Sequence, residues 1–174
     1  MKRLSLAIIT LLACAGAQAA SEEKVTMNLV TSQGVGQAIG TVTIAETGKG
    51  LEFTPDLKAL PPGEHGFHVH MNGSCQPAIK DGKASAAESA GGHYDPHKTG
   101  KHEGPEGAGH MGDLPLLVVN NEGNATTAVT ASRLKSLDEI KGKALMIHVG
   151  GDNMSDQPKP LGGGGARYAC GVIK

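Results

Sequence analysis

The chain has 174 residues, enough for a single domain with a sizeable hydrophobic core. With 16 basic and 17 acidic residues its formal net charge is −1, and only four residues are aromatic. This charge balance excludes a nucleic-acid-binding protein, which carries a marked excess of Lys and Arg, and the scarcity of aromatic residues predicts an aliphatic core.

Residues 1–19 have the features of a secretory signal. Lys2 and Arg3 precede an apolar run that is too short to span a bilayer, and small residues lead to a cleavage site after Ala19. We expect residues 1–19 to be a signal peptide and residues 20–174 to form one mature domain with no membrane span. Cleavage takes the 16 basic residues to 14 against 17 acidic ones, a net charge of −3.

The expected export signal determines which cysteines remain in the mature chain. The run LLAC, which ends at Cys14, resembles a lipoprotein processing site and offers a lipid-anchored form as the alternative to cleavage. Otherwise Cys14 leaves with the signal, and Cys75 and Cys170 remain. Two cysteines in an exported chain predict one structural disulfide, which stabilises by up to about 4–5 kcal/mol on the entropic account. Free buried thiols would require a reducing compartment.

The mature chain then shows short stretches in which apolar and polar residues alternate, separated by turn-forming residues. We expect strands over residues 24–30, 39–46, 50–60, 143–150 and 166–173, and a hairpin around an NEGN turn over residues 114–131. Pro55 limits its strand to an edge or a bend. Several short strands at regular spacing are typical of an all-β sandwich or barrel.

Three segments depart from this pattern. Residues 132–143 have helix-like apolar spacing that ends at Gly142, and we interpret them as a connection rather than a core helix. Residues 71–113 and 150–166 have no strand pattern and few large apolar residues. Loops of this length are normally functional or disordered. Because these two have few apolar side chains to bury, we expect a disulfide and a metal to order them.

The stretch GEHGFHVH, residues 63–70, contains three histidines. Side chains alternate along a strand, so His68 and His70 share one face while His65 does not. We expect the first two to be metal ligands and His65 to be a buried, hydrogen-bonded residue at the base of the loop. Imidazole suits copper, zinc and iron alike, so the pair alone does not identify the metal.

Further nitrogen and oxygen donors follow along the chain. The first long loop contains His93, His97, His102, His110 and Asp113. His148 lies in an apolar strand, where it is a candidate partner for the H-x-H pair across the sheet. An N4 set favours Cu(II), whereas three loop histidines with Asp113 suit a tetrahedral zinc. The two sites together require one shared histidine or one more ligand, and the spacing does not decide between these.

Four motifs together resemble the bacterial, periplasmic Cu,Zn superoxide dismutases: GFHVH, GGHYDPHKTGKHEGPEGAGHMGDLP, MIHVGGDN and GGGGARYACGVI. The resemblance covers nearly the whole mature chain, and the motifs are long and specific. It implies an all-β fold, an eight-stranded Greek-key β-barrel in the form of a flattened sandwich, with both metals under two long loops. It also implies one copper and one zinc per subunit and a periplasmic location.

The resemblance assigns ligands residue by residue. It implies that copper is held by His68, His70, His93 and His148, and zinc by His93, His102, His110 and Asp113. His93 would bridge the two metals, and His97 would be left over as a surface residue. Cys75 and Cys170 match the family disulfide.

Two supporting roles follow from the same resemblance. Arg167 matches the arginine that holds superoxide near copper, and Asp152 matches a carboxylate expected to link His70 with His102. Copper alternating between Cu(II) and Cu(I) would turn two superoxide ions and two protons into dioxygen and hydrogen peroxide, with His93 passing a proton to the forming peroxide. Copper, Arg167 and lysines such as Lys80 or Lys159 would attract the anion.

Two other functions compete with dismutation. A copper-binding module without turnover could use the same histidines, with methionines as soft Cu(I) ligands; the candidates are Met71, Met111, Met146 and Met154. A zinc hydrolase would need an open zinc position, which a closed set of three histidines and Asp113 does not leave. The sequence does not choose between a monomer and a homodimer.

Overall fold

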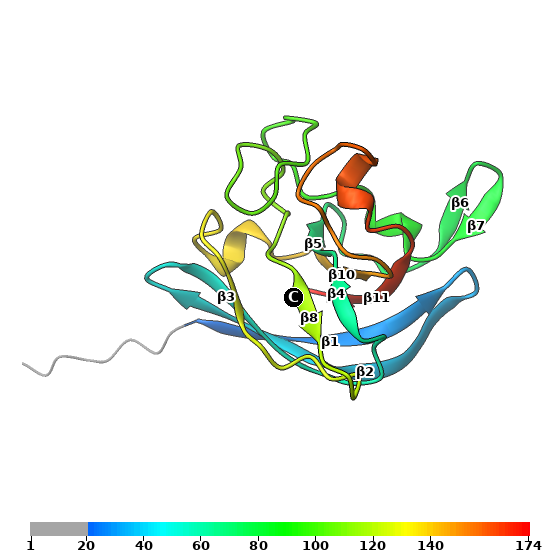
Figure 1. Cartoon of the computed structure of the whole chain (residues 1–174), viewed down its shortest axis with the longest axis horizontal. Helices are drawn as coiled ribbons and strands as arrows, with labels where there is room; N and C mark the ends of the chain where they lie inside the picture. Colours follow the sequence, from blue (N-terminus) through cyan, green and yellow to red (C-terminus); the bar gives the residue numbers. More distant parts are fainter. Residues whose placement is uncertain (1–20) are drawn as a thin grey trace, which may run out of the picture.

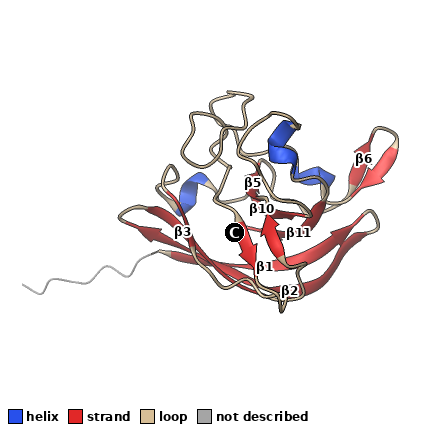
Figure 2. Cartoon of the chain, in the orientation of Figure 1, coloured by secondary structure: helices blue, strands red, loops and turns tan. Residues whose placement is uncertain are grey.

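A computed structural model describes residues 21–174, so the expected signal peptide and Cys14 lie outside the described residues. The described chain is all-β, and the segments drawn in blue in Figure 2 are short 3-10 turns; no α-helix occurs in residues 21–174. Its strands are β1 (Glu22–Thr31), β2 (Gly34–Thr47), β3 (Gly50–Leu57), β4 (Gly63–His65), β5 (Phe67–His70), β6 (Ala78–Lys80), β7 (Lys83–Ser85), β8 (Leu117–Val119), β9 (Val129–Ala131), β10 (Ala144–His148) and β11 (Arg167–Val172). The 3-10 turns are η1 (Glu88–Ala90), η2 (Leu137–Glu139) and η3 (Pro160–Gly163).

The strands form one curled antiparallel sheet in the order β5-β10-β11-β1-β2-β3-β9, with β4 and β8 paired beside it (Figure 1). Only Gly66 separates β4 from β5. Counted as one interrupted strand, these two bring the barrel to the expected eight strands, and the hairpin β6–β7 projects away from it. The expected all-β Greek-key barrel is confirmed.

The expectation of a hairpin over residues 114–131 is wrong. The turn itself forms, with the Asn120 amide donating to the Asn124 carbonyl at 2.9 Å. However, β8 pairs with β4 and β9 pairs with β3, so the two flanking strands are not partners. Turn chemistry controls only the few residues it connects, whereas the pairing of each strand depends on the wall of the barrel against which its apolar side chains pack.

The segment at residues 132–143 is a connection, as expected. It contains only the single turn η2, which begins with a capping box between Ser136 and Glu139. Leu134 and Ile140 are fully buried on either side of this turn. The helix-like apolar spacing therefore reflects two anchor points on the barrel and not a core helix.

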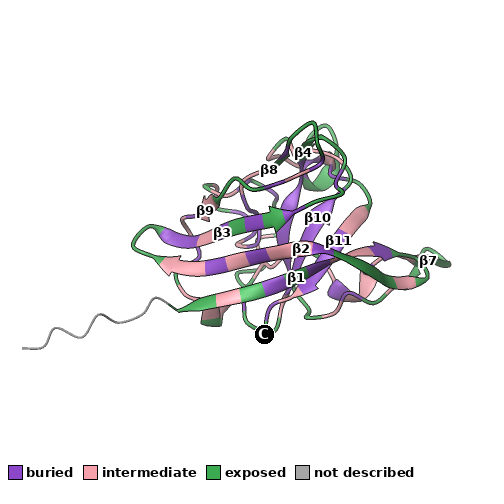
Figure 3. Ribbon diagram, turned by 90° about the horizontal axis from the view of Figure 1, so that it is seen from below, coloured by how far each residue is buried: buried purple, intermediate pink, exposed green. Residues whose placement is uncertain are grey.

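The core is aliphatic, with one pair of aromatic rings. Along β1, β2 and β3 buried residues alternate with more exposed ones, as the colours along these strands show in Figure 3. Phe53 and Phe67 pack edge to face, with ring centroids 5.9 Å apart. Phe67 and Val69 anchor one face of β5 in this core, and this leaves the opposite face of β5 free to carry other chemistry.

Apart from the projecting hairpin β6–β7, the two long loops expected at residues 71–113 and 150–166 lie together over β5 and β10, on one side of the barrel (Figure 1). A disulfide between Cys75 and Cys170 ties the first loop to β11, as expected. Within residues 21–174 no helix is both long and apolar enough to cross a membrane. Together the two loops cover one wall of the apolar barrel with polar residues.

Candidate metal centre

The outer face of β5 carries His68 and His70, both almost completely buried under the loops. Their alternation with Phe67 and Val69 is the parity that the sequence predicts. His148 ends the neighbouring strand β10, where it is also buried. Three histidines from two adjacent strands thus face the same space.

Backbone pairing of the first long loop with β5 brings in the next residues. His93 forms an isolated bridge with His70, and Asp113 forms one with His68. Between these bridges the Val69 amide donates to the Gly112 carbonyl at 2.9 Å. A Cβ atom on Gly112 would lie only 2.2 Å from the Val69 carbonyl oxygen, so glycine is required for this close approach.

The β-strand histidines each use one ring nitrogen for orientation. His68 donates from Nε2 to Asp152 at 2.7 Å, and His70 donates from Nδ1 to the Gly91 carbonyl at 2.8 Å. His148 Nδ1 lies 3.1 Å from the Gly165 carbonyl. Hydrogen bonding at one nitrogen selects the tautomer in which the other nitrogen is a free acceptor.

His93 is placed between two groups of donors. Its Nδ1 lies 2.9 Å from Asp113 Oδ1, and its ring stacks at 3.9 Å between centroids on that of His68. Its Nε2 points to the other histidines. Four buried nitrogens without a hydrogen-bond partner then remain on that side: His68 Nδ1, His70 Nε2, His93 Nε2 and His148 Nε2.

These four histidines have donor atoms that all lie within 4.8 Å of one another. Buried polar atoms are nearly always satisfied in folded proteins, because an unpaired one costs about 1–3 kcal/mol. Four such atoms converging on one point fit a metal ion, and a set of four imidazole nitrogens suits copper.

A second set of donors lies around Asp113. His102 Nδ1 is 2.9 Å from Asp113 Oδ2, and His110 Nδ1 is 3.5 Å from Asp113 Oδ1. Despite this proximity, His102 Nδ1 and Asp113 Oδ2 have no hydrogen-bond partner, because the short distance lacks the direction of a hydrogen bond. Both atoms instead face a common point, and this donor set of nitrogen and carboxylate oxygen suits a closed zinc site.

His68 also approaches the second set, since His68, His93, His102 and Asp113 have donor atoms within 4.8 Å of one another. The one unpaired nitrogen of His68, Nδ1, already belongs to the four-histidine set, because its Nε2 is taken by Asp152. His110 Nδ1, which is also buried and unpaired, is the further candidate beside Asp113. His93 is then the residue that presents one nitrogen to each set.

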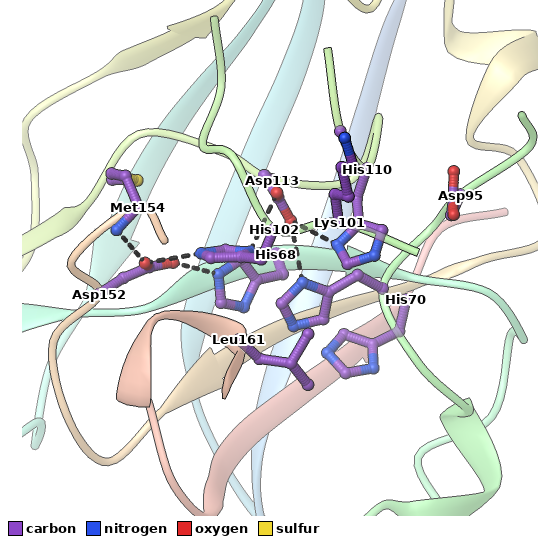
Figure 4. A network of polar contacts seen from close by, with 12 residues as sticks. His68, His70, Asp95, Lys101, His102, His110, Asp113, Asp152, Met154 and Leu161 are labelled. Carbon is purple, nitrogen blue, oxygen red and sulfur yellow. Dashed lines mark hydrogen bonds and ion pairs between the residues drawn. The ribbon is translucent and has the colours of Figure 1, made fainter. Parts of the chain in front are cut away.

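Asp152 connects the two sets, but by a different route from the one expected. Its carboxylate accepts from His68 Nε2 and His102 Nε2, both at 2.7 Å (Figure 4). The expected link to His70 is wrong, because the ring of that residue turns to the Gly91 carbonyl. Parity along β5 shows which residues share a face, but the loop that approaches each ring is a matter of tertiary structure.

Burial gives the strand histidines the protonation state that a metal needs. Desolvation lowers the pKa of His68 to about 3 and that of His148 to about 4, and it lowers the pKa of His70 well below the ordinary value. These rings are therefore neutral at pH 7, and a neutral imidazole is the form that ligates metals.

His102 behaves in the opposite way in the metal-free chain. Burial works against its charged form, but the carboxylates of Asp113 and Asp152 beside its two ring nitrogens outweigh burial and raise its pKa to about 9. The same contacts hold the pKa values of Asp113 and Asp152 well below their usual range, against the effect of burial. A cation placed between these carboxylates would take over the role of the His102 proton.

Arg167 lies at the edge of the four-histidine cluster. Its guanidinium donates to the carbonyls of Ala87 and Gly91, both at 2.6 Å, and Nη1 lies 3.2 Å from Glu88. Because the Gly91 carbonyl also accepts from His70, one peptide group fixes both the cation and a cluster histidine. An anion entering the cluster would therefore meet a fixed guanidinium.

The remaining histidines take the places expected of them. His65 is buried, with its ring nitrogens 2.8 Å from the His148 carbonyl and 2.7 Å from the Pro61 carbonyl, which confirms its role at the loop base. His97 is exposed and belongs to neither donor set. Lys80 pairs with Glu88 at 3.4 Å, and Lys159 is exposed.

Three contributors escaped the sequence analysis. Asp156 accepts from the His102 amide at 2.9 Å, Arg133 donates to carbonyls of the loop, and Glu88 pairs with Arg167. Charged residues in polar loops give no local signal of this kind. The one available signal concerns Arg133: after the signal region the sequence contains only two arginines, Arg133 and Arg167.

The competing functions find less support in this geometry. Met146 is fully buried in an apolar cluster beside the disulfide, opposite His68 across β5 and β10. Met71 is 40% exposed, and its sulfur accepts from the Asp95 amide at 3.5 Å. The structure gathers four candidate donors around Asp113, and a zinc held by all four would have no position for a substrate water.

Comparisons of the sequence and of the structure with known proteins all point to one family. The profile of the copper/zinc superoxide dismutase family (SODC) matches residues 38–173. A superoxide dismutase [Cu-Zn] of Escherichia coli (strain K12) is 82% identical over 174 residues, which is 100% of both chains. The solved Cu/Zn superoxide dismutase from Brucella abortus has a TM-score of 0.87 and 55% identity, covering 88% of this chain and 100% of its own. A monomeric copper, zinc superoxide dismutase from Salmonella enterica, solved in solution, has a TM-score of 0.80 and 80% identity with the same coverage.

Proposed function

The chain belongs to the copper/zinc superoxide dismutase family, and on that premise we infer that it converts superoxide into dioxygen and hydrogen peroxide. One copper and one zinc per subunit serve this reaction. The observation that carries the inference is the presence of two adjacent groups of buried donor atoms, most of them unpaired, with His93 in both groups. No ordinary structural role accounts for so many unsatisfied buried atoms.

We propose that copper is held by His68, His70, His93 and His148, and zinc by His93, His102, His110 and Asp113. The free nitrogens support this division, because those of the first set lie on one side of His93 and those of the second on the other. When bound, copper supplies reversible one-electron chemistry and zinc supplies a fixed positive charge.

The protein's own groups then have separate tasks. His93 holds its Nδ1 toward Asp113, which leaves Nε2 as the atom that would hold copper and, when free of it, could carry a proton to a reduced oxygen species. Asp152 keeps the rings of His68 and His102 in register. Burial of the ring cluster excludes bulk water, so a proton has to arrive through a protein atom such as His93 Nε2.

Arg167 is proposed to bind the substrate. Burial lowers the pKa of its guanidinium and Glu88 raises it again, and at every physiological pH the group stays charged. Because it is fixed by two carbonyls, it offers its remaining N–H groups to an anion with little loss of side-chain entropy. The exposed Lys80 and Lys159 add to the attraction of superoxide in a chain whose net charge is negative.

We further propose that residues 1–19 direct export to the periplasm and are removed, and that residues 20–174 act as a monomer. The charged and apolar pattern of the N-terminus supports export. The monomeric relative from Salmonella enterica, which is 80% identical, supports the oligomeric state. N-terminal sequencing of protein from the periplasmic fraction and sedimentation equilibrium test the two points; an intact N-terminus or a mass near twice that of the chain would refute them.

The experiment that tests the activity is direct decay of superoxide, followed for the metal-free protein and after loading with copper and zinc. We expect near diffusion-limited decay only in the copper-loaded form, and a loss of more than about 100-fold in His148→Ala, because one of the four donors for copper is gone. His97→Ala is the matched control, since this exposed histidine lies outside both donor sets.

Consumption of superoxide in proportion to protein, without turnover, would contradict dismutation and favour a copper-binding module. Full turnover of His148→Ala would instead refute the assignment of that ligand while leaving the activity in place.

A further inference from the structure

The three histidines around Asp113 are unequally supported. His102 is held at Nε2 by Asp152 and at its backbone amide by Asp156. His93 has contacts at both the β5 wall and Asp113. His110 is different: within residues 21–174 its ring makes no hydrogen bond, and its Nδ1 is 3.5 Å from Asp113 Oδ1, the longest such distance of the set. The position of the His110 ring therefore depends on its backbone.

That backbone is held at both of its polar groups. The His110 amide donates to the Lys101 carbonyl at 2.9 Å, which joins the two arms of the loop. On the other side, Arg133 donates from Nη1 to the His110 carbonyl at 3.1 Å and from Nη2 to the Gly109 carbonyl at 2.9 Å. One planar guanidinium thus spans two consecutive peptide groups, a geometry that a single ammonium cannot reproduce.

Arg133 is itself mounted on the barrel. It lies between β9 and the fully buried Leu134, whose carbonyl accepts from the Leu51 amide at 2.9 Å. Its neighbour Ser132 contacts both carboxylate oxygens of Glu106 at 2.9 Å, nearer the tip of the same loop. The connection after β9 therefore forms a rigid base against which the returning arm of the loop rests.

We propose that Arg133 is a positioning residue for zinc, which acts by holding the backbone of His110 so that its Nδ1 faces the zinc point. This inference rests on the proposed assignment of His110 as a zinc ligand. Arg133 touches neither the metal nor the substrate, and its effect is on how long zinc stays bound. Groups that orient metal ligands typically change metal affinity by about 10–100-fold when they are removed.

The test is the rate at which the fully loaded protein releases zinc to an excess of a chromophoric chelator. We expect Arg133→Gln to release zinc about 10-fold faster or more than the unchanged protein, and Arg133→Lys to fall between the two because it can serve only one carbonyl well. Lys135→Gln is the matched control: it removes one positive charge two residues away, from an exposed side chain. Cobalt substituted for zinc gives a second readout, with its visible absorption bands shifted in Arg133→Gln and unchanged in Lys135→Gln.

Release within about twofold of the unchanged protein in both Arg133 variants would overturn the inference, even if thermal unfolding of their metal-free forms were altered, because that pattern describes a purely structural contact. Should Arg133→Gln fail to fold, Arg133→Lys carries the same test. His110→Ala separates the two levels of the argument. If it retains zinc as tightly as the unchanged protein, the ligand assignment falls; if it loses zinc while the Arg133 variants do not, only the positioning role falls.

Discussion

At the scale of single residues, the centre is organised by the two nitrogens of each imidazole ring. One nitrogen of His68, His70 and His148 is spent on a carboxylate or carbonyl, and the other is left unpaired in a buried space. This division selects a tautomer before any metal arrives, so the ligand lone pairs are already directed. Asp152 does this for two rings at once, one in each donor set.

Asp152→Asn is expected to weaken the binding of at least one metal by about 10–100-fold. Both His68 and His102 present an Nε2–H to the carboxylate, and an amide –NH₂ in place of one oxygen would face one of these donors with another donor. That ring would have to move its proton to Nδ1, the atom that faces the metal. Competition titration with a chelator of known affinity measures the effect, with Asp138→Asn as an exposed control. Equal affinities in the two variants would count against the role of Asp152.

At the scale of elements, β5 joins the core to the centre. Its inward residues, Phe67 and Val69, belong to the hydrophobic core, and its outward residues carry the histidines. The loop segments around His93 and Asp113 add to β5 through backbone bridges, so a strand ladder, and not side-chain packing alone, sets the spacing of the donors. Gly112 makes this approach possible because it has no Cβ atom.

Gly112→Ala is expected to destabilise the metal-free protein by about 2 kcal/mol or more, because the new Cβ would meet backbone atoms that cannot move aside. The nearest of these would be the Val69 carbonyl oxygen at 2.2 Å and the Tyr94 amide nitrogen at 2.8 Å. Gly92→Ala is the matched control in the same loop, since a Cβ there has nothing within 4 Å. Urea unfolding of both variants measures the difference, and similar midpoints would show that the loop can shift away from β5 at low cost.

At the scale of the whole molecule, an apolar barrel supports two long polar loops that could not become ordered by burying apolar side chains of their own. The Cys75–Cys170 disulfide and the backbone bridges fasten these loops, and together they bury a cluster of six histidines and two aspartates. Burial of so many ionisable groups makes the stability of the metal-free protein depend on pH.

We expect the metal-free protein to be most stable near neutral pH. Burial depresses the pKa values of His68, His70 and His148, so below about pH 6.5 the unfolded chain takes up protons that the folded chain does not. The free energy of unfolding therefore decreases progressively as the pH is lowered. His102 has the opposite sign: its pKa of about 9 contributes stability that is complete below 6.5 and is lost as pH rises toward 9. Thermal unfolding should therefore show a melting temperature at least about 5 °C lower at pH 5 than at pH 7, and again lower above pH 9. A flat profile between pH 5 and 7 would contradict the burial of neutral imidazoles.

Local pattern alone determined much of this protein. Alternation predicted most strands and placed His68 and His70 on one face with His65 excluded, because side-chain direction along a strand follows from covalent geometry and needs no distant contact. The types of donor also indicated a nitrogen-rich copper set and a zinc set containing Asp113. Whole motifs, taken together, pointed to the family and through it to a shared His93.

Tertiary structure decided what local pattern could not. The partners of β8 and β9, the choice of His68 and not His70 as the ring that Asp152 holds, and the contact of Arg133 with His110 all join residues far apart in the chain. Such contacts depend on how the barrel closes and on which loop then passes over which strand. A sequence periodicity of two or 3.6 residues contains no information about that, because it describes one element at a time.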